Sequence, residues 1–177
     1  MEFKTLIEKR RSVRAFDGRP VTREQIKTIA RDIQMAPSWK NSQTGRVYAA
    51  FSPAFVDGVR KALPEFNQRS TEKAPAFLVT TFKKGIAGFT AEGTPTNELG
   101  QGWGAYDLGL RDAYLILSAS EQGLDTLIMG CRDAVALRKL FSIPDDEEIA
   151  AVIALGYRAG EPVFRPRKPV EELVRID

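Results

Sequence analysis

Three arginines and a serine fall within five positions near the amino terminus, in the segment RRSVRAF at residues 10–16. A guanidinium group presents a planar fork of N–H donors that matches two oxygens of a phosphate or a carboxylate. In an extended segment the side chains alternate, so Arg10, Ser12 and Arg14 point to the same side. The pattern predicts either an anion-binding segment or a solvated basic turn, and this segment alone does not decide between them.

Two further groups of residues could take part in the same site. The segment APSWKNSQ, residues 36–43, carries serines and amides that donate and accept hydrogen bonds, as recognition of a heterocycle requires and as ordinary turns also do. Near the carboxyl terminus a small group of cations comprises Arg165, Arg167 and Lys168. One phosphate could bring this distant group together with the first arginine segment.

The residue types that the chain lacks exclude several kinds of site. It has no histidine, and Cys131 is its only cysteine. Intramolecular disulfides, zinc sites of His or paired Cys, and Ser/His or Cys/His catalytic pairs are therefore ruled out, and no metal site is expected. The chemistry must come from other side chains or from a bound cofactor. Because no GxGxxG or Walker lysine motif is present, any nucleotide would be held by side chains.

The formal net charge of +3 is unevenly spread, since residues 1–50 hold 11 Lys and Arg against 5 Asp and Glu. This local excess fits an anion site better than a nucleic-acid-binding face. No apolar run approaches the roughly 20 residues of a membrane span, and the first residues lack the pattern of a signal peptide. We therefore expect a cytoplasmic protein with no nucleic-acid partner and no membrane partner.

The elements that position these residues follow from hydrophobic spacing. Helices are predicted at residues 2–9, from a capping box of Thr22 and Gln25 to Pro37, and from about 133. A further helix carries Phe55, Val56, Val59 and Leu63 and stops at Pro64. Strands are predicted at 47–51, 76–82 and 149–157. Strands interspersed with helices indicate a mixed α+β or α/β domain.

Three further stretches carry expectations of their own. Residues 105–123 form a helix that is apolar on most sides, which predicts a place in the core, in a subunit interface or in both. Residues 83–104 hold six glycines and no apolar periodicity, which indicates a lid or a mobile segment. The acidic run DDEE at 145–148 is interpreted as a solvated turn.

Together these segments resemble the nitroreductase family of FMN-dependent oxidoreductases. The segment RRSVRAF, the loop APSWKNSQ, the stretch GLDTLIMG after the long helix and the terminal RPRKPVEELV occur in order over nearly the whole chain. The resemblance implies an α+β fold with a mostly antiparallel central sheet wrapped by helices, in an intertwined homodimer. Residues 1–177 would form one FMN-binding domain, with residues 158–177 as a C-terminal arm.

The resemblance also implies which residues bind FMN. The phosphate would be bound by Arg10, Ser12, Arg165 and Arg167, with Arg11 beside them. The ribityl chain and the flavin ring would meet Arg14 and Asn67, and the backbone N–H groups facing N5 and O4 would come from Met129 and Gly130. The partner subunit would contribute Pro37, Ser38, Trp39, Asn41 and Gln43. No catalytic side chain is expected, because the flavin N5 carries the chemistry.

The implied activity is a ping-pong cycle in which NAD(P)H passes hydride to the flavin and a nitroaromatic, quinone or similar electrophilic acceptor then takes the electrons. Trp39, Phe89 and Trp103 are candidates to line or cover the pocket, although they could equally be ordinary core or interface aromatics. Two alternatives stay open: a flavoprotein that handles or modifies flavin with little NAD(P)H turnover, and a basic interaction module without a cofactor.

The sequence departs from the family pattern at two places that concern the site. Gln43 is followed by Thr44 and Gly45, where the family often continues Pro-Trp, so the packing beneath the flavin or the substrate is expected to differ. Ser70 stands where a lysine is common.

Overall fold

Two long runs of apolar and β-branched residues form the centre of an antiparallel sheet. In the computed structural model, which describes residues 2–177, the sheet has four strands in the order β1-β2-β4-β3. Their bounds are β1 (Gly45–Ala50), β2 (Ala76–Lys83), β3 (Asp125–Met129) and β4 (Glu147–Gly156). The central strands β2 and β4 are buried on both faces, as their continuous apolar sequences predict. The predicted α+β class with an antiparallel sheet is confirmed.

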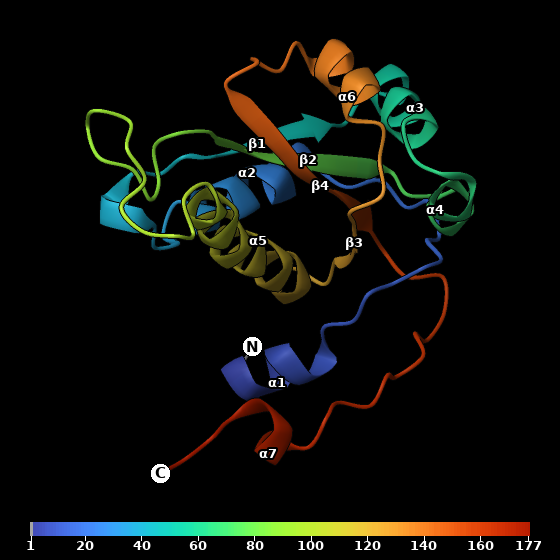
Figure 1. Cartoon of the computed structure of the whole chain (residues 1–177). Coiled ribbons are helices and arrows are strands. Elements are labelled where there is room, and N and C mark those ends of the chain that lie inside the picture. Colours follow the sequence, from blue (N-terminus) through green and yellow to red (C-terminus); the bar gives the residue numbers. More distant parts are fainter. Residues whose placement is uncertain (1) are drawn as a thin grey trace.

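Helices cover both faces of this sheet, as Figure 1 shows. On one face α3 (Pro53–Lys61) and α6 (Ala134–Phe141) pack over Phe77 and Val79. On the other face α2 (Arg23–Ile33) and α5 (Gly102–Glu121) pack over Leu78. The remaining elements are α1 (Phe3–Lys9), the 3-10 turn η1 (Trp39–Asn41), α4 (Glu65–Ser70) and α7 (Val170–Leu173). The alternation along β2 thus divides the core into two layers.

The start of α2 confirms the predicted capping box. The Thr22 hydroxyl accepts the Gln25 N–H at 3.2 Å, and the Gln25 side chain accepts the Thr22 N–H at 2.9 Å. Two of the unpaired donors at the helix amino terminus are satisfied in this way. The same Gln25 side chain donates to the Tyr157 hydroxyl at 3.1 Å, which ties α2 to the chain that follows β4.

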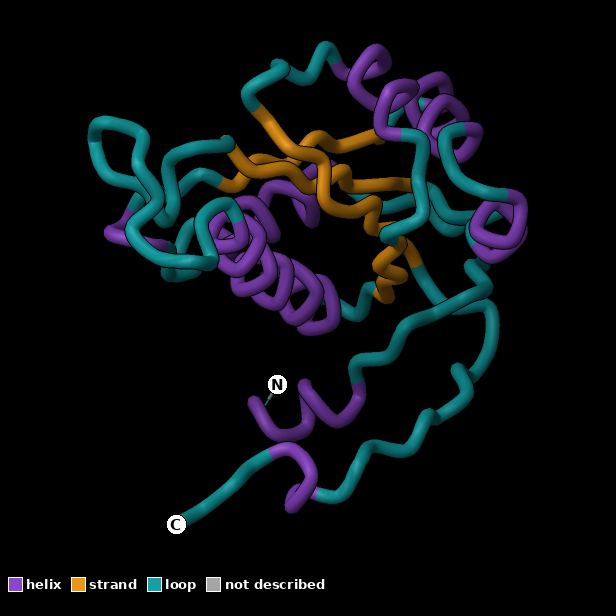
Figure 2. Tube along the Cα trace, viewed as in Figure 1, coloured by secondary structure: helices purple, strands orange, loops and turns teal. Residues whose placement is uncertain are grey.

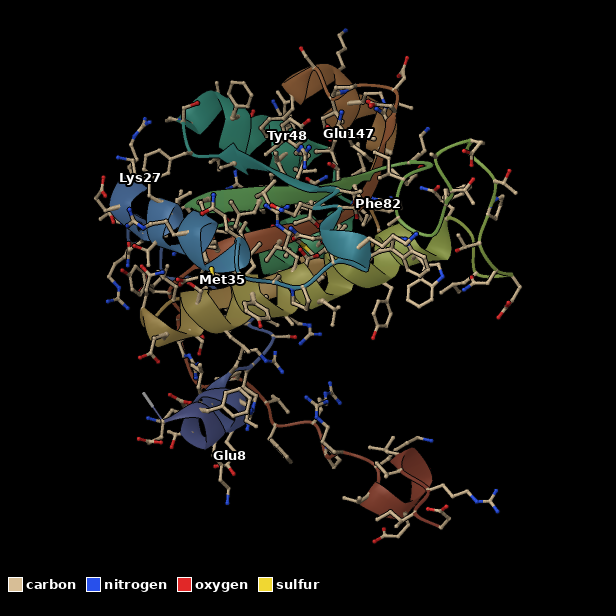
Figure 3. The ribbon with its side chains drawn as sticks, turned by 90° about the vertical axis from the view of Figure 1, so that its left-hand side faces the viewer. Glu8, Lys27, Met35, Tyr48, Phe82 and Glu147 are labelled. Atoms are coloured by element: carbon tan, nitrogen blue, oxygen red, sulfur yellow. The ribbon has the colours of Figure 1, made fainter. Side chains whose placement is uncertain are left out.

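The acidic run at 145–148 was wrongly interpreted as a fully solvated turn. Glu147 is only 3% exposed, because it begins β4 and its carboxylate accepts hydrogen bonds from the Tyr48 hydroxyl at 2.9 Å and the Thr81 hydroxyl at 2.5 Å. Figure 3 shows Tyr48 and Glu147 side by side. Burial and the hydrogen bond to Glu147 raise the pKa of Tyr48 to about 12, so the phenol stays a donor. Cross-strand hydrogen bonds have overridden the local charge pattern.

The glycine-rich stretch is a series of turns, but its ends differ from the expected bounds of 83–104. Lys83 still belongs to β2, and α5 already begins at Gly102. Gly104 lies so close to β2 that an added Cβ would come within 2.4 Å of the Phe82 ring. A glycine at this position therefore allows the helix to pack against the strand rather than marking a loop.

The chain termini lie away from the sheet, as Figure 2 shows. Helix α1 and the segment that ends in α7 extend from one side of the core. Helix α1 and the residues from α7 onward carry exposed apolar side chains, at Phe3, Val170, Leu173, Val174 and Ile176. Among residues 2–177, no helix has the length and apolar character needed to cross a bilayer.

Candidate active site

The arginine segment runs extended beside the sheet and contacts β3 and the residues that follow β4. The Val13 N–H donates to the Thr126 carbonyl in β3 at 3.0 Å, and the Asp17 N–H donates to the Tyr157 carbonyl just after β4 at 3.0 Å. Val13 is buried, whereas its neighbours Ser12 and Arg14 are exposed. The side chains therefore alternate around Val13, whereas Arg10 is half-buried and Ala15 is exposed like Arg14, so the alternation does not extend along the whole segment.

The C-terminal arm brings a second group of cations to this segment. The positive charges of Arg167 and Arg11, together with burial as the largest cause, lower the pKa of Arg10. The Arg11 guanidinium lies 5.0 Å from the centre of the Phe164 ring, which is a cation–π contact between the two segments. The ion pairs formed within residues 2–177 include none of these three arginines. Like charges gathered without a counter-ion are typical of an anion site.

An ion pair at the start of the arm sets the position of this group. Arg158 follows β4, and its guanidinium makes a bidentate contact with Asp125 in β3, with a shortest distance of 2.6 Å. The Arg158 N–H also donates to Asp125 at 3.0 Å, and the Ala159 N–H donates to the Ala15 carbonyl at 3.0 Å. The arm is thus attached to both β3 and the arginine segment where it leaves the sheet.

Asn67 and the turn after β3 lie together on the same side of the molecule. The buried Asn67, 8% exposed, donates from its amide to the Cys131 carbonyl at 3.4 Å. Met129 ends β3 in the core, and Gly130 is exposed. An added Cβ at Gly130 would meet no atom within 4 Å, so open space lies in front of this turn. A planar group could approach the backbone there.

The loop at residues 36–43 has an unusual backbone held by specific contacts. Lys40, Asn41 and Gln43 all have φ between 47° and 56°, a region that non-glycine residues rarely adopt. The Trp39 N–H donates to Asp107 in α5 at 2.8 Å, and the Gln43 N–H donates to the Ser38 hydroxyl at 3.0 Å. Strain of this kind persists where surrounding contacts enforce it, and it is concentrated at functional sites.

One chain does not bring this loop to the arginine segment. Gly45, which follows the loop, pairs with Phe82 at one end of β2, whereas Ala76 at the other end pairs with Leu155, the partner of Thr126. Figure 1 shows the same separation, with the cyan turn of η1 on one side of the sheet and α4 on the other. The candidate residues therefore form two half-sites at opposite ends of the sheet.

Aromatic side chains join the loop to the glycine-rich segment. The rings of Trp39 and Trp103 lie 4.7 Å apart, and Trp103 contacts Tyr106 at 5.5 Å. A pocket of about 400 Å³ lies between Trp39 and residues 85–91, and Phe89 also lines it. Two of the three predicted pocket aromatics, Trp39 and Phe89, thus line one cavity. The third, Trp103, packs against the Trp39 ring.

Two acidic residues that hold the half-sites were not recognised in the sequence. Asp107 fixes the loop through the Trp39 N–H, and Asp125 fixes the arm through Arg158. Burial raises the pKa of Asp107, and the hydrogen bond from Trp39 opposes that rise. For Asp107 the available signal was an acidic residue within a mostly apolar helix, and it identifies a buried acid without identifying its partner.

Asp112 provides a test of the buried polar layer behind the loop. Burial raises its pKa to about 6, against a hydrogen bond from the Thr80 hydroxyl at 3.1 Å. A carboxyl whose pKa is higher in the folded than in the unfolded state stabilises the fold fully at low pH, and that stability is lost as pH rises from about 4 to 6. Asp112→Asn should remove this dependence and raise the free energy of unfolding at pH 8 by about 2 kcal/mol.

Urea unfolding at pH 4, 5, 6 and 8 measures this effect. Asp57→Asn is the matched control, because Asp57 is exposed and forms only a surface pair with Lys61. Parallel pH profiles for Asp112→Asn and the parent protein would contradict the prediction.

The chain is similar to known proteins over most of its length. The model of the nitroreductase family matches residues 7–157. A curated protein of Thermus thermophilus, described as an NADH dehydrogenase, is 28% identical over 200 residues, which cover 98% of this chain and 95% of that protein.

Solved structures share the fold over most of the chain. A candidate nitroreductase in complex with FMN from Exiguobacterium sibiricum 255-15 superposes with a TM-score of 0.88 at 20% identity, covering 100% of this chain and 98% of that one. An oxidoreductase described as containing FMN superposes with a TM-score of 0.75 at 27% identity, covering 88% and 76%.

Proposed function

The chain belongs to the nitroreductase family, and on that premise we propose that it is an FMN-dependent oxidoreductase. It takes electrons from NADH or NADPH and delivers them to a small electrophilic acceptor such as a nitroaromatic or a quinone. The names of its relatives support the two cofactor assignments, since one is described as an NADH dehydrogenase and others contain or bind FMN. The acceptor class rests on the family alone.

The observation that carries this proposal is the cluster of unpaired cations formed by Arg10, Arg11 and Arg167. Burial first, and then the positive charges of Arg167 and Arg11, lower the pKa of Arg10. A dianion placed among these cations would be stabilised because it offsets their repulsion. The FMN phosphate is such a group, and the exposed Ser12 and the arm residue Arg165 add donors beside it. The residues present therefore fit the phosphate end of FMN.

The ring end of FMN fits the open turn at Gly130. The Asn67 amide lies on one side of this turn, and no atom lies within 4 Å of the place that a Cβ would take at Gly130. The Gly130 carbonyl accepts a hydrogen bond from the Arg132 guanidinium at 3.0 Å. When bound, the flavin supplies a hydride acceptor at N5 and passes hydride on to the second substrate. The protein's part is to hold the ring, to offer backbone donors from residues 129–130, and to keep a cation near the flavin N1.

The loop at residues 36–43 reaches a flavin only in a homodimer, because in its own chain it lies at the other end of the sheet. We assign residues 158–177 as an arm that wraps the partner, within a single domain of residues 1–177. The exposed apolar side chains of α1, α7 and α5, among them Tyr106 at 56% exposure, support this assignment. Each active site then contains residues of both chains.

Arg14 is expected to set the flavin potential. Its side chain is exposed, and one guanidinium nitrogen donates to the Ser12 carbonyl at 3.4 Å, so it is free to turn toward a ligand. A cation near N1 stabilises the reduced flavin, so Arg14→Met should lower the two-electron potential by about 30–60 mV, equivalent to one charged hydrogen bond. Spectroelectrochemical titration measures this shift, and equal potentials in variant and parent would count against the placement.

The visible spectrum of the purified protein tests the function itself. We expect a yellow protein whose flavin absorbance is bleached within seconds of stopped-flow mixing with NADH or NADPH and recovers when a quinone is added. A colourless protein that does not bind added FMN would exclude a flavoprotein. A yellow protein that neither nicotinamide bleaches would support a role in flavin handling instead.

A further inference from the structure

A second pocket lies behind the loop, between the end of α2, the start of β1 and the first turns of α5. It has a volume of about 380 Å³, within the range of small-molecule sites. In Figure 3, Met35 just after α2 and Phe82 at the end of β2 mark this end of the molecule. The polar residues of its wall are Gln34, Ser38, Thr44, Arg46, Asp107 and Arg111.

Two buried polar atoms in or at this wall have no hydrogen-bond partner among residues 2–177. One is the hydroxyl of Thr44, a residue only 2% exposed, and the other is the Nε of Arg111. An unpaired buried hydroxyl or N–H costs free energy, so each such group calls for a partner that the chain itself does not supply. Both groups can donate to an anion.

The charge of the pocket favours an anion as that partner. Burial and the nearby Arg46 lower the pKa of Arg111, and the charge of Asp112 opposes them. The guanidiniums of Arg46 and Arg111 donate only to the backbone carbonyls of Gln43 and Gly45. No ion pair within residues 2–177 includes either arginine. Asp107, one helical turn before Arg111, is instead held by the Trp39 N–H. Among the residues that line the pocket, two cations and one acid leave an excess of one positive charge, which Asp112, outside the wall but close to Arg111, offsets when it is ionised.

Gly45 explains why Arg111 can occupy this place. A Cβ at Gly45 would lie 2.8 Å from Arg111 Nη1 and 2.9 Å from its Cδ, so any larger residue would displace the guanidinium. The departure from the family pattern at Thr44 and Gly45 therefore introduces the unpaired hydroxyl and makes room for the arginine. The other walls are apolar and comprise Ala30, Ile33, Ala36, Pro37 and Val47.

We propose that this pocket is a carboxylate-binding subsite, in which Arg111 and the Thr44 hydroxyl hold the acid group of a small aromatic or aliphatic molecule. The subsite uses one guanidinium edge and one hydroxyl, which match a planar monoanion with an apolar body. Pro37, Ser38 and Gln43 line the same pocket and are the residues assigned to the partner's flavin. The identity of the ligand rests on the proposed function: the acid is the anionic group of the electron acceptor, so acidic acceptors are the preferred class.

Calorimetric titration of the purified protein with benzoate tests the subsite without any turnover. We expect measurable binding of benzoate and at least tenfold weaker binding of benzamide, its uncharged analogue. Arg111→Met should weaken benzoate binding about tenfold or more, and Thr44→Val, which removes only the hydroxyl, about threefold to tenfold. Arg31→Met, which deletes an exposed arginine of α2, is the matched control and should leave benzoate affinity unchanged.

The kinetic arm compares a nitrobenzoate with the corresponding nitrobenzamide. The ratio of kcat/KM for the acid over the amide should fall about tenfold in Arg111→Met. Equal benzoate affinity in the parent, Arg111→Met and Thr44→Val proteins would overturn the subsite even if the enzyme reduces both acceptors. If the protein binds no flavin, the proposed function fails, and the benzoate titrations still decide whether the subsite exists.

Discussion

The double variant Arg10→Ala/Arg167→Ala is expected to be purified almost free of FMN. Each arginine should contribute about 1.5–3 kcal/mol to binding of the phosphate, the range of a hydrogen bond to a charged group. Together they amount to a loss of affinity on the order of 10²–10⁴-fold. The two residues come from segments more than 150 positions apart, so only a ligand bound between them makes both essential.

The same variant should not destabilise the protein when flavin is absent. In the free protein burial and, after it, the positive charge of Arg167 lower the pKa of Arg10, so removing both charges relieves their repulsion. We expect an apoprotein Tm equal to or slightly above that of the parent, together with the large loss of FMN affinity. A merely structural role for these arginines would move both quantities downward.

Fluorescence titration of the apoprotein with FMN measures the affinity. The control is Lys9→Ala/Lys168→Ala, which removes the same net charge beside each arginine, and Lys168 forms only a surface pair with Glu172. Unchanged FMN affinity in the arginine variant, or an equal loss in the lysine control, would refute the phosphate site.

Local patterns predicted those elements whose stability comes from their own sequence. The capping box of Thr22 and Gln25 marked the start of α2, and the apolar runs at 76–82 and 149–157 marked the two central strands. Such features depend on neighbours a few positions away, which a single sequence displays. The same reasoning missed β3 as a strand, because its five residues DTLIM follow a long apolar helix without any alternation of polarity.

The site was predicted as a set of residues, whereas its supports depend on contacts between distant segments. No spacing rule connects Asp107 with the Trp39 N–H, or Asp125 with Arg158. Glu147 was misread for the same reason, since its burial depends on Tyr48 and Thr81 in other strands. Buried acids are the places where tertiary hydrogen bonds override the local preference for solvent. These pairings required the three-dimensional structure.

The separation of the two half-sites leads to the second large prediction, which is complementation between two inactive chains. Arg10 and Arg167 are called the clamp, because we assign them to the two sides of the flavin phosphate. The clamp variant, Arg10→Ala/Arg167→Ala, loses the phosphate site of its own chain. The loop variant, Asn41→Gly/Gln43→Gly, loses two amides that we assign to the partner's flavin, and glycine accepts the positive φ of both positions without strain. Two lost hydrogen bonds should weaken FMN binding about 10- to 100-fold, so at limiting FMN both homodimers should be nearly colourless.

A mixed dimer purified through two different tags should then recover about one FMN per dimer. If each flavin is held by the clamp of one chain and the loop of the other, the two defects fall together in one site and leave the second site intact. If clamp and loop act within one chain, every site of the mixed dimer carries one defect and no flavin is recovered. Absorbance of the tandem-purified dimer separates these results, and monomeric chains would contradict the shared site directly. Within one chain the fold places the loop and the clamp at opposite ends of the sheet. Recovery of one flavin is therefore the outcome that this geometry requires of a functional protein.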